Sequence, residues 1–68
     1  MYVIAKIFDK DAKRGFAKLQ ALKTRGIDTI VDFVEIVPTF DGLSFVHIDY
    51  RRLTDGQQQW LCGFFAAL

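Results

Sequence analysis

The stretch that decides the fold is residues 31–51, VDFVEIVPTFDGLSFVHIDYR. It holds two runs rich in β-branched and aromatic residues, and Asp41-Gly42 lies between them. An Asp-Gly pair flanked by such runs is the strongest short-range signal of a β-hairpin. The sequence therefore predicts two antiparallel strands, near residues 31–38 and 43–51.

Residues 27–37 leave a second interpretation open. The acidic residues Asp28, Asp32 and Glu35 recur there at helical spacing, whereas the apolar residues between them are of the types that strands favour. The hairpin signal that follows decides in favour of a strand. A helix in this segment would remove one strand and change which residues lie on each face of the sheet.

The segments on either side of the hairpin predict one further strand and two helices. Residues 2–8 are rich in strand-forming residues. Asp9 or Asp11 can cap a helix that runs to about residue 25, where Gly26 stands at the position that glycine favours after a helix.

The last helix is predicted from a start signal and an apolar repeat. Thr54 and Gln57 fit the Ser/Thr-x-x-Glu/Gln capping box. Apolar side chains then recur at helical spacing over residues 60–68.

The predicted order is strand, helix, strand, strand, helix, in one small α+β domain covering residues 1–68. These are the first five elements of the ferredoxin-like split βαβ arrangement, without its final strand. A right-handed crossover places both helices on one face of a three-stranded antiparallel sheet. Many unrelated functions use this order of elements, so the fold by itself assigns none.

Composition excludes a disulfide as a way of stabilising so short a chain, and it excludes one common kind of metal site. The 68 residues include one cysteine and one histidine, which rules out an intrachain disulfide and a Cys/His zinc framework. We expect no cofactor and no metal. The start of the chain lacks the basic region of a signal peptide, and no apolar run is long enough to cross a bilayer. The expected location is therefore cytoplasmic, with no membrane partner.

A two-residue turn at Asp41-Gly42 would place Phe40 opposite Leu43 and fix which residues share a face of the sheet. The face away from the helices is then expected to be apolar, and such exposed patches mark interfaces. The expected interface residues are Tyr2, Ile4, Phe8, Val34, Ile36, Phe45 and His47.

A register slip of one residue would exchange the two faces of the hairpin strands. Both faces would still be substantially apolar, because the strands do not alternate cleanly between apolar and polar residues. A sheet that is apolar on both sides needs cover on both sides, and the predicted helices cover one. The sequence therefore predicts a homodimer formed through the sheet.

Charge is segregated along the chain: residues 5–26 carry a net charge of +5 and residues 27–50 a net charge of −5. Five basic residues are expected on the outer face of the first helix, where they could contact nucleic acid or an acidic partner. They are Lys10, Lys13, Arg14, Lys18 and Arg25. The simpler interpretation is a solvated helix exterior, since no aromatic or amide side chains that read bases accompany them.

Two residues, His47 and Cys62, are of types that take part in catalysis. His47 is expected to share a strand face with Asp49, so an imidazole–carboxylate contact is possible. No nucleophile lies near this pair by local spacing, and Cys62 is expected to be a buried small hydrophobic residue. We expect no catalytic residues.

The leading functional hypothesis is a small non-enzymatic protein-interaction module. It would be homodimeric through its apolar sheet face and would act as a regulator or inhibitor of another macromolecule. Two alternatives remain open: nucleic-acid binding by the basic helix face, and a small dimeric enzyme that uses His47.

Overall fold

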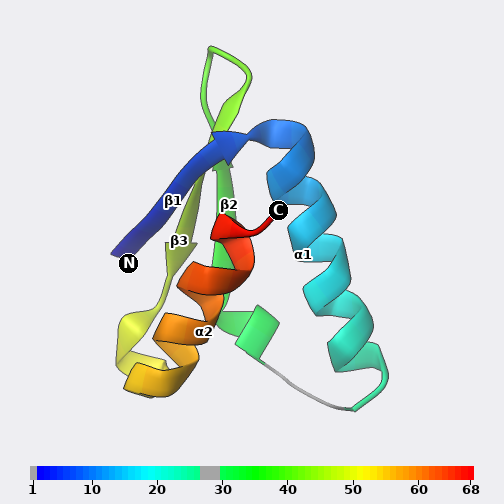
Figure 1. Cartoon of the computed structure of the whole chain (residues 1–68), viewed down its shortest axis with the longest axis vertical. Coiled ribbons are helices and arrows are strands. Elements are labelled where there is room, and N and C mark those ends of the chain that lie inside the picture. The colour runs from blue at the N-terminus through cyan, green and yellow to red at the C-terminus, as the bar shows by residue number, and fades with distance from the viewer. Residues whose placement is uncertain (1, 27–29) are drawn as a thin grey trace.

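A computed structural model describes residues 2–26 and 30–68. Its elements are β1 (Tyr2–Phe8), α1 (Asp9–Thr24), β2 (Val34–Pro38), β3 (Leu43–Ile48) and α2 (Asp55–Ala66). Two short 3₁₀ helices, η1 (Ile30–Phe33) and η2 (Tyr50–Arg52), precede β2 and α2. The order confirms the predicted α+β fold with βαββα connectivity (Figure 1).

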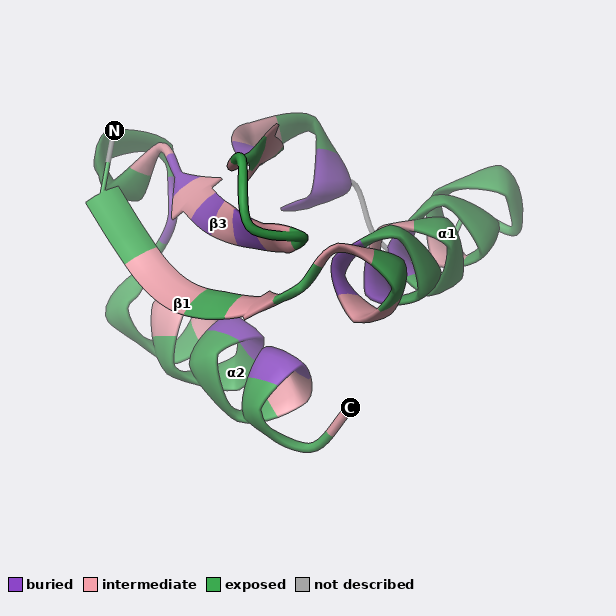
Figure 2. Cartoon of the chain, turned by 90° about the horizontal axis from the view of Figure 1, so that it is seen from above, coloured by how far each residue is buried: buried purple, intermediate pink, exposed green. Residues whose placement is uncertain are grey.

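The three strands form an antiparallel sheet in the order β1-β3-β2, so β3 is central and the other two strands are edges. Both helices pack on one face of this sheet (Figures 1 and 2). Leu19 of α1 meets Leu61 and Phe65 of α2 over the sheet, in a buried cluster. The strands contribute Val34, Val46 and Ile48 to the same cluster. We call this side of the sheet the covered face and the other side the open face.

The end of α1 follows the prediction, but its start does not. Gly26 has a φ of 71° and its N–H donates to the carbonyl of Lys23 at 2.9 Å, which is the glycine-ended helix expected. At the start, neither Asp9 nor Asp11 caps the helix, because no side chain makes a capping hydrogen bond there. The Asp9 carboxylate instead accepts a hydrogen bond from Ser44, at the start of β3.

The predicted capping box at the start of α2 is confirmed. The Gln57 N–H donates to Thr54 Oγ1 at 3.1 Å, and the Thr54 N–H donates to Gln57 Oε1 at 2.9 Å. This arrangement satisfies two of the N–H groups that every helix start leaves unpaired.

The helices approach each other closely at Gly15, which is buried on α1. A Cβ atom on Gly15 would lie 2.5 Å from Leu68 Cδ1 and 2.9 Å from Phe65 Cε1. These distances are too short for a methyl group, so glycine is what allows the end of α2 to pack against α1.

Both hairpin strands are shorter than predicted. Residues 31–33 belong to η1, so β2 begins at Val34, and β3 ends at Ile48 before η2. The prediction of strand in place of helix holds for residues 34–37 and fails for 31–33, where a short 3₁₀ helix forms. Residues 27–29 lie outside the described part of the chain.

The hairpin register differs from the prediction by one residue. Val37 lies opposite Phe45 and Pro38 opposite Ser44, and the Thr39 N–H donates to the carbonyl of Leu43 at 2.8 Å. The loop therefore has three residues, 40–42, and ends on Gly42 with a φ of 80°. A three-residue loop closed by a left-handed glycine is the next common hairpin after the two-residue turn. The Thr39 hydroxyl, which contacts Asp41 and the carbonyl of Leu43, stabilises it.

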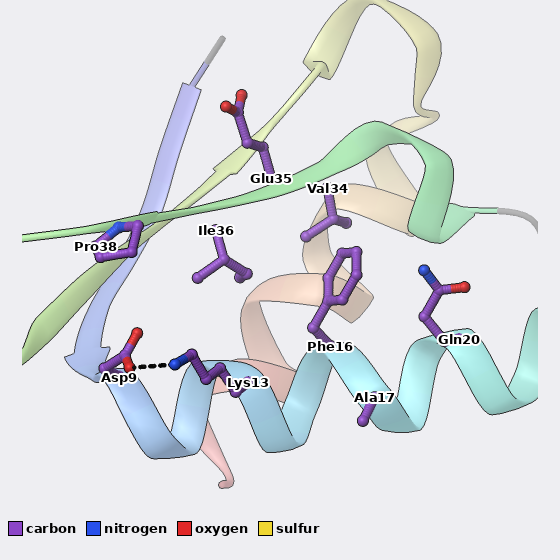
Figure 3. A pocket seen from close by; sticks show the side chains of 9 residues that line it. All are labelled: Asp9, Lys13, Phe16, Ala17, Gln20, Val34, Glu35, Ile36 and Pro38. Carbon is purple, nitrogen blue, oxygen red and sulfur yellow. Dashed lines mark ion pairs between the residues drawn. The ribbon is translucent and has the colours of Figure 1, made fainter.

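This shift moves β2 to the other face, so the placement of Val34 and Ile36 on the open face is wrong. Val34 is 7% exposed, and Ile36 packs against the same buried cluster. Figure 3 shows both side chains directed toward α1, whereas Glu35 points away.

Two residues of β1 are also misplaced by the prediction, because the pairing of β1 with β3 contains a bulge between Val3 and Ala5. A bulge changes the alternation of side chains along a strand. Ile4, inside the bulge, packs against the buried cluster instead of the open face. The Tyr2 ring lies against Tyr50, with centroids 6.2 Å apart, and beside α2.

Candidate interaction surfaces

The open face carries three rows of paired side chains. Val3, His47 and Glu35 form one row, Lys6, Phe45 and Val37 the next, and Phe8 with Leu43 the third. Of the predicted interface residues, Phe8, Phe45 and His47 lie on this face, and the bulge and the register shift add Val3 and Val37. Along β3 the burial alternates between buried and intermediate residues (Figure 2).

The aromatic side chain at the middle of the open face is packed by its neighbours. The Lys6 ammonium lies 5.3 Å from the centroid of the Phe45 ring, and the His47 ring centroid is 6.2 Å from it. Val3 and Phe8 beside them are 47% and 61% exposed. The face therefore presents apolar side chains to solvent, as predicted, although only some of them are the predicted residues.

The charges of the open face lie on opposite edges of the sheet. Lys6 is on β1 and Glu35 is on β2, with Phe45 and His47 of the central strand β3 between them. The nearest anion to Lys6 is Asp41 Oδ2 at 4.0 Å, and both side chains are about half exposed or more. A pair so exposed and so long contributes little stability, so Lys6 remains available to another anion.

His47 does not form the contact with a carboxylate that its sequence neighbour suggests. Asp49 lies beyond the end of β3, with its carboxylate 3.6 Å from Arg52 Nε. Within residues 2–26 and 30–68, no hydrogen bond joins Asp49 to His47, and no group of three metal-binding side chains occurs.

The predicted basic stripe lies on α1 and is partly neutralised by acidic residues of the same helix. Lys13 Nζ is 3.0 Å from Asp9, and Arg14 is 3.1 Å from Asp11. Lys10, Lys18 and Arg25 form no ion pair with other described residues. Arg25 follows the last residue of the helix.

A buried hydroxyl joins the start of α1 to the sheet, a contact the sequence analysis missed. Ser44 is fully buried, and its Oγ donates to Asp9 Oδ1 at 2.7 Å. This hydrogen bond, followed by that from Lys13, holds the pKa of Asp9 below its usual value. The two residues are 35 positions apart, so no local pattern could have paired them.

A groove of about 650 Å³ runs between α1 and β2 (Figure 3). Phe16, Val34 and Ile36 form its apolar floor, and Asp9, Lys13 and Gln20 stand around it. The groove was not predicted from the sequence, because Val34 and Ile36 were expected on the other side of the sheet.

The outer side of α2 is more exposed than its apolar sequence predicts. Cys62 is exposed, which corrects the expectation that it is buried. Trp60 is 47% exposed and stacks on Phe64 with ring centroids 5.2 Å apart. Among the described residues no helix is both long and apolar enough to cross a membrane.

Comparisons with protein-family models, with curated proteins and with solved structures give no match to this chain.

Proposed function

We propose that this protein is a non-enzymatic protein-interaction module that forms a homodimer through its open sheet face. The observation that carries the proposal is the apolar side chains of that face, where Val3 and Phe8 are exposed and Phe45 is partly exposed, opposite the helix-covered side. A small sheet with one solvated face normally carries polar residues there.

The charges on the open face favour a second copy as the occupant. A two-fold axis parallel to the strands sets β1 of one copy against β2 of the other, because the axis exchanges the two edges of the sheet. Lys6 of each copy then faces the edge that carries Glu35 of the partner. The two residues belong to adjacent rows, about 7 Å apart along the strands, a distance that long side chains can span.

The dimer would leave α1, α2 and the sheet edges free to bind another macromolecule. We propose a regulator or inhibitor role in the cytoplasm for this assembly, since so small a chain offers binding surfaces more readily than an enclosed catalytic site. Nucleic-acid binding by α1 is the second candidate, favoured by Lys10 and Lys18, which form no ion pair with described residues.

The test compares the masses of matched variants by sedimentation over a range of concentrations. Phe45→Lys places a charge at the centre of the open face, and we expect it to weaken dimerisation at least about tenfold while the fold is retained. Phe40→Lys introduces the same charge at the fully exposed hairpin loop and should leave the dimer intact. A wild-type monomer, or equal behaviour of the two variants, would overturn the proposal.

A further inference from the structure

The groove between α1 and β2 lies directly beside a free strand edge. β2 is the last strand of the sheet, and no strand in residues 2–26 or 30–68 pairs with its outer side. Figure 3 shows Val34 and Ile36 directed from β2 into the groove, opposite Phe16 of α1, and Ala17 of the same helix also lines it. The groove thus has an apolar floor and a backbone edge along one rim.

The hydrogen bonds of the hairpin determine which backbone groups this edge presents. The Thr39 N–H donates to the carbonyl of Leu43, and the carbonyl of Phe33 accepts from the Asp49 N–H. Since successive residues of a strand direct their backbone groups to opposite sides, residues 33, 35, 37 and 39 point toward β3. Ile36 therefore directs both its N–H and its C=O outward, and the carbonyls of Val34 and Pro38 do the same.

The α1 side of the groove is cationic at one end. Lys13 stands at the groove with its side chain 72% exposed, although Asp9 offsets part of its charge. Lys10 lies seven residues before Ala17 and so falls on the same flank of the helix. Lys10 forms no ion pair with other described residues.

We propose that this groove binds an extended peptide segment, with apolar side chains at alternate positions and an acidic side chain at the end near Lys10 and Lys13. The peptide adds a fourth strand beside β2, exchanging backbone hydrogen bonds with Ile36, while its apolar side chains contact Phe16, Val34 and Ile36. Backbone hydrogen bonds to the β2 edge supply affinity. The apolar floor of the groove, together with Lys10 and Lys13, determines which peptide sequences bind.

This site is separate from the proposed dimer interface. Val34 and Ile36 point into the groove on the covered side of the sheet, whereas dimerisation would use the open side. A dimer of the proposed kind therefore leaves both copies of the groove accessible, and the two proposals can fail independently.

The test titrates the ¹⁵N-labelled protein with the peptide Thr-Glu-Thr-Val-Thr-Val-Thr-Glu-Thr, which presents Glu-Val-Val-Glu to the groove in either direction. We expect saturable shifts of the Ile36 amide and of α1 amides at up to about 1 mM peptide. Ala17→Glu, which adds bulk and negative charge at the groove, should weaken binding at least about tenfold. Ala66→Glu makes the same change at an exposed alanine of α2 and should leave binding unchanged.

A second peptide, methylated at the nitrogens of its central Val-Thr-Val, separates strand addition from simple apolar contact. It should bind at least about tenfold more weakly, because it cannot donate hydrogen bonds to the β2 edge. Three results would overturn the proposal: no saturable binding, equal binding by the methylated peptide, or equal binding to the Ala17→Glu variant. Dissociation of the dimer by Ala17→Glu would also overturn it, since the groove would then hold a second copy of the chain.

Discussion

The two faces of the sheet are built from the same strands and both carry apolar side chains, yet helices cover only one of them. On the covered face Val46 and Ile48 are fully buried under α1 and α2. On the open face Phe45, one residue away from Val46, is partly exposed beside Lys6. Apolar side chains on the first face hold the chain together, and those on the second are available to hold copies together.

The largest effect on stability should come from a comparison of the same substitution, to lysine, at Val46 and at Phe45. Val46→Lys buries an ammonium with no partner under the helices, and the cost of several kcal/mol exceeds the roughly 3–5 kcal/mol that so small a core supplies. We expect an unfolded chain by circular dichroism, whereas Phe45→Lys should keep its native spectrum. A folded Val46→Lys variant would show that the assignment of the two faces is wrong.

A smaller effect on stability is expected when two helical glycines are replaced by alanine, one on the covered side of the molecule and one on its exterior. Gly15→Ala forces a methyl group against Phe65 and Leu68, and we expect a loss of about 1–3 kcal/mol in the free energy of unfolding. Gly63→Ala meets no atom within 4 Å on the exposed side of α2 and should gain about 0.5–1 kcal/mol. Urea denaturation measures both, and effects of the same sign would contradict the helix packing described.

The smallest effect concerns the one hydrogen bond that joins Ser44 on the covered face to Asp9. Because the folded-state pKa of Asp9 is lowered, its contribution to stability is present above the unfolded pKa and is lost as pH falls through the folded pKa. Ser44→Ala should therefore lower the melting temperature modestly at neutral pH, and the difference from wild type should shrink in acid. A difference that stays constant from neutral pH to acid would contradict the role assigned to this bond.

The element order was predictable because each element carries a local signal. Three of these signals each lie within a short stretch of sequence: the capping box at Thr54, the terminal glycine at Gly26 and the Asp41-Gly42 loop. All three features form. The length of the hairpin loop was not predictable, since two- and three-residue loops both accept Asp-Gly. That one-residue difference places Val34 and Ile36 on the covered face instead of the open face.

The candidate surfaces followed from the sequence only in part. Phe8, Phe45 and His47 were placed correctly on the open face, and the register shift still leaves one apolar residue of β2 there, because Val37 takes the place of Val34 and Ile36. The bulge that buries Ile4 depends on how β1 pairs with a strand some 40 residues later. The groove beside β2 required the correct register and the packing of α1, neither of which a local pattern contains.

The most direct test of the account is whether the open faces of two copies touch in solution. In a sample that mixes ¹³C-labelled and unlabelled protein, isotope-filtered nuclear Overhauser spectra detect contacts between copies only. We predict such contacts between the Phe45 ring and the methyl groups of Val3 and Val37. Contacts confined to α1, α2 or the β2 edge, or none at concentrations where the mass shows a dimer, would contradict the assignment of the open face as the dimer interface.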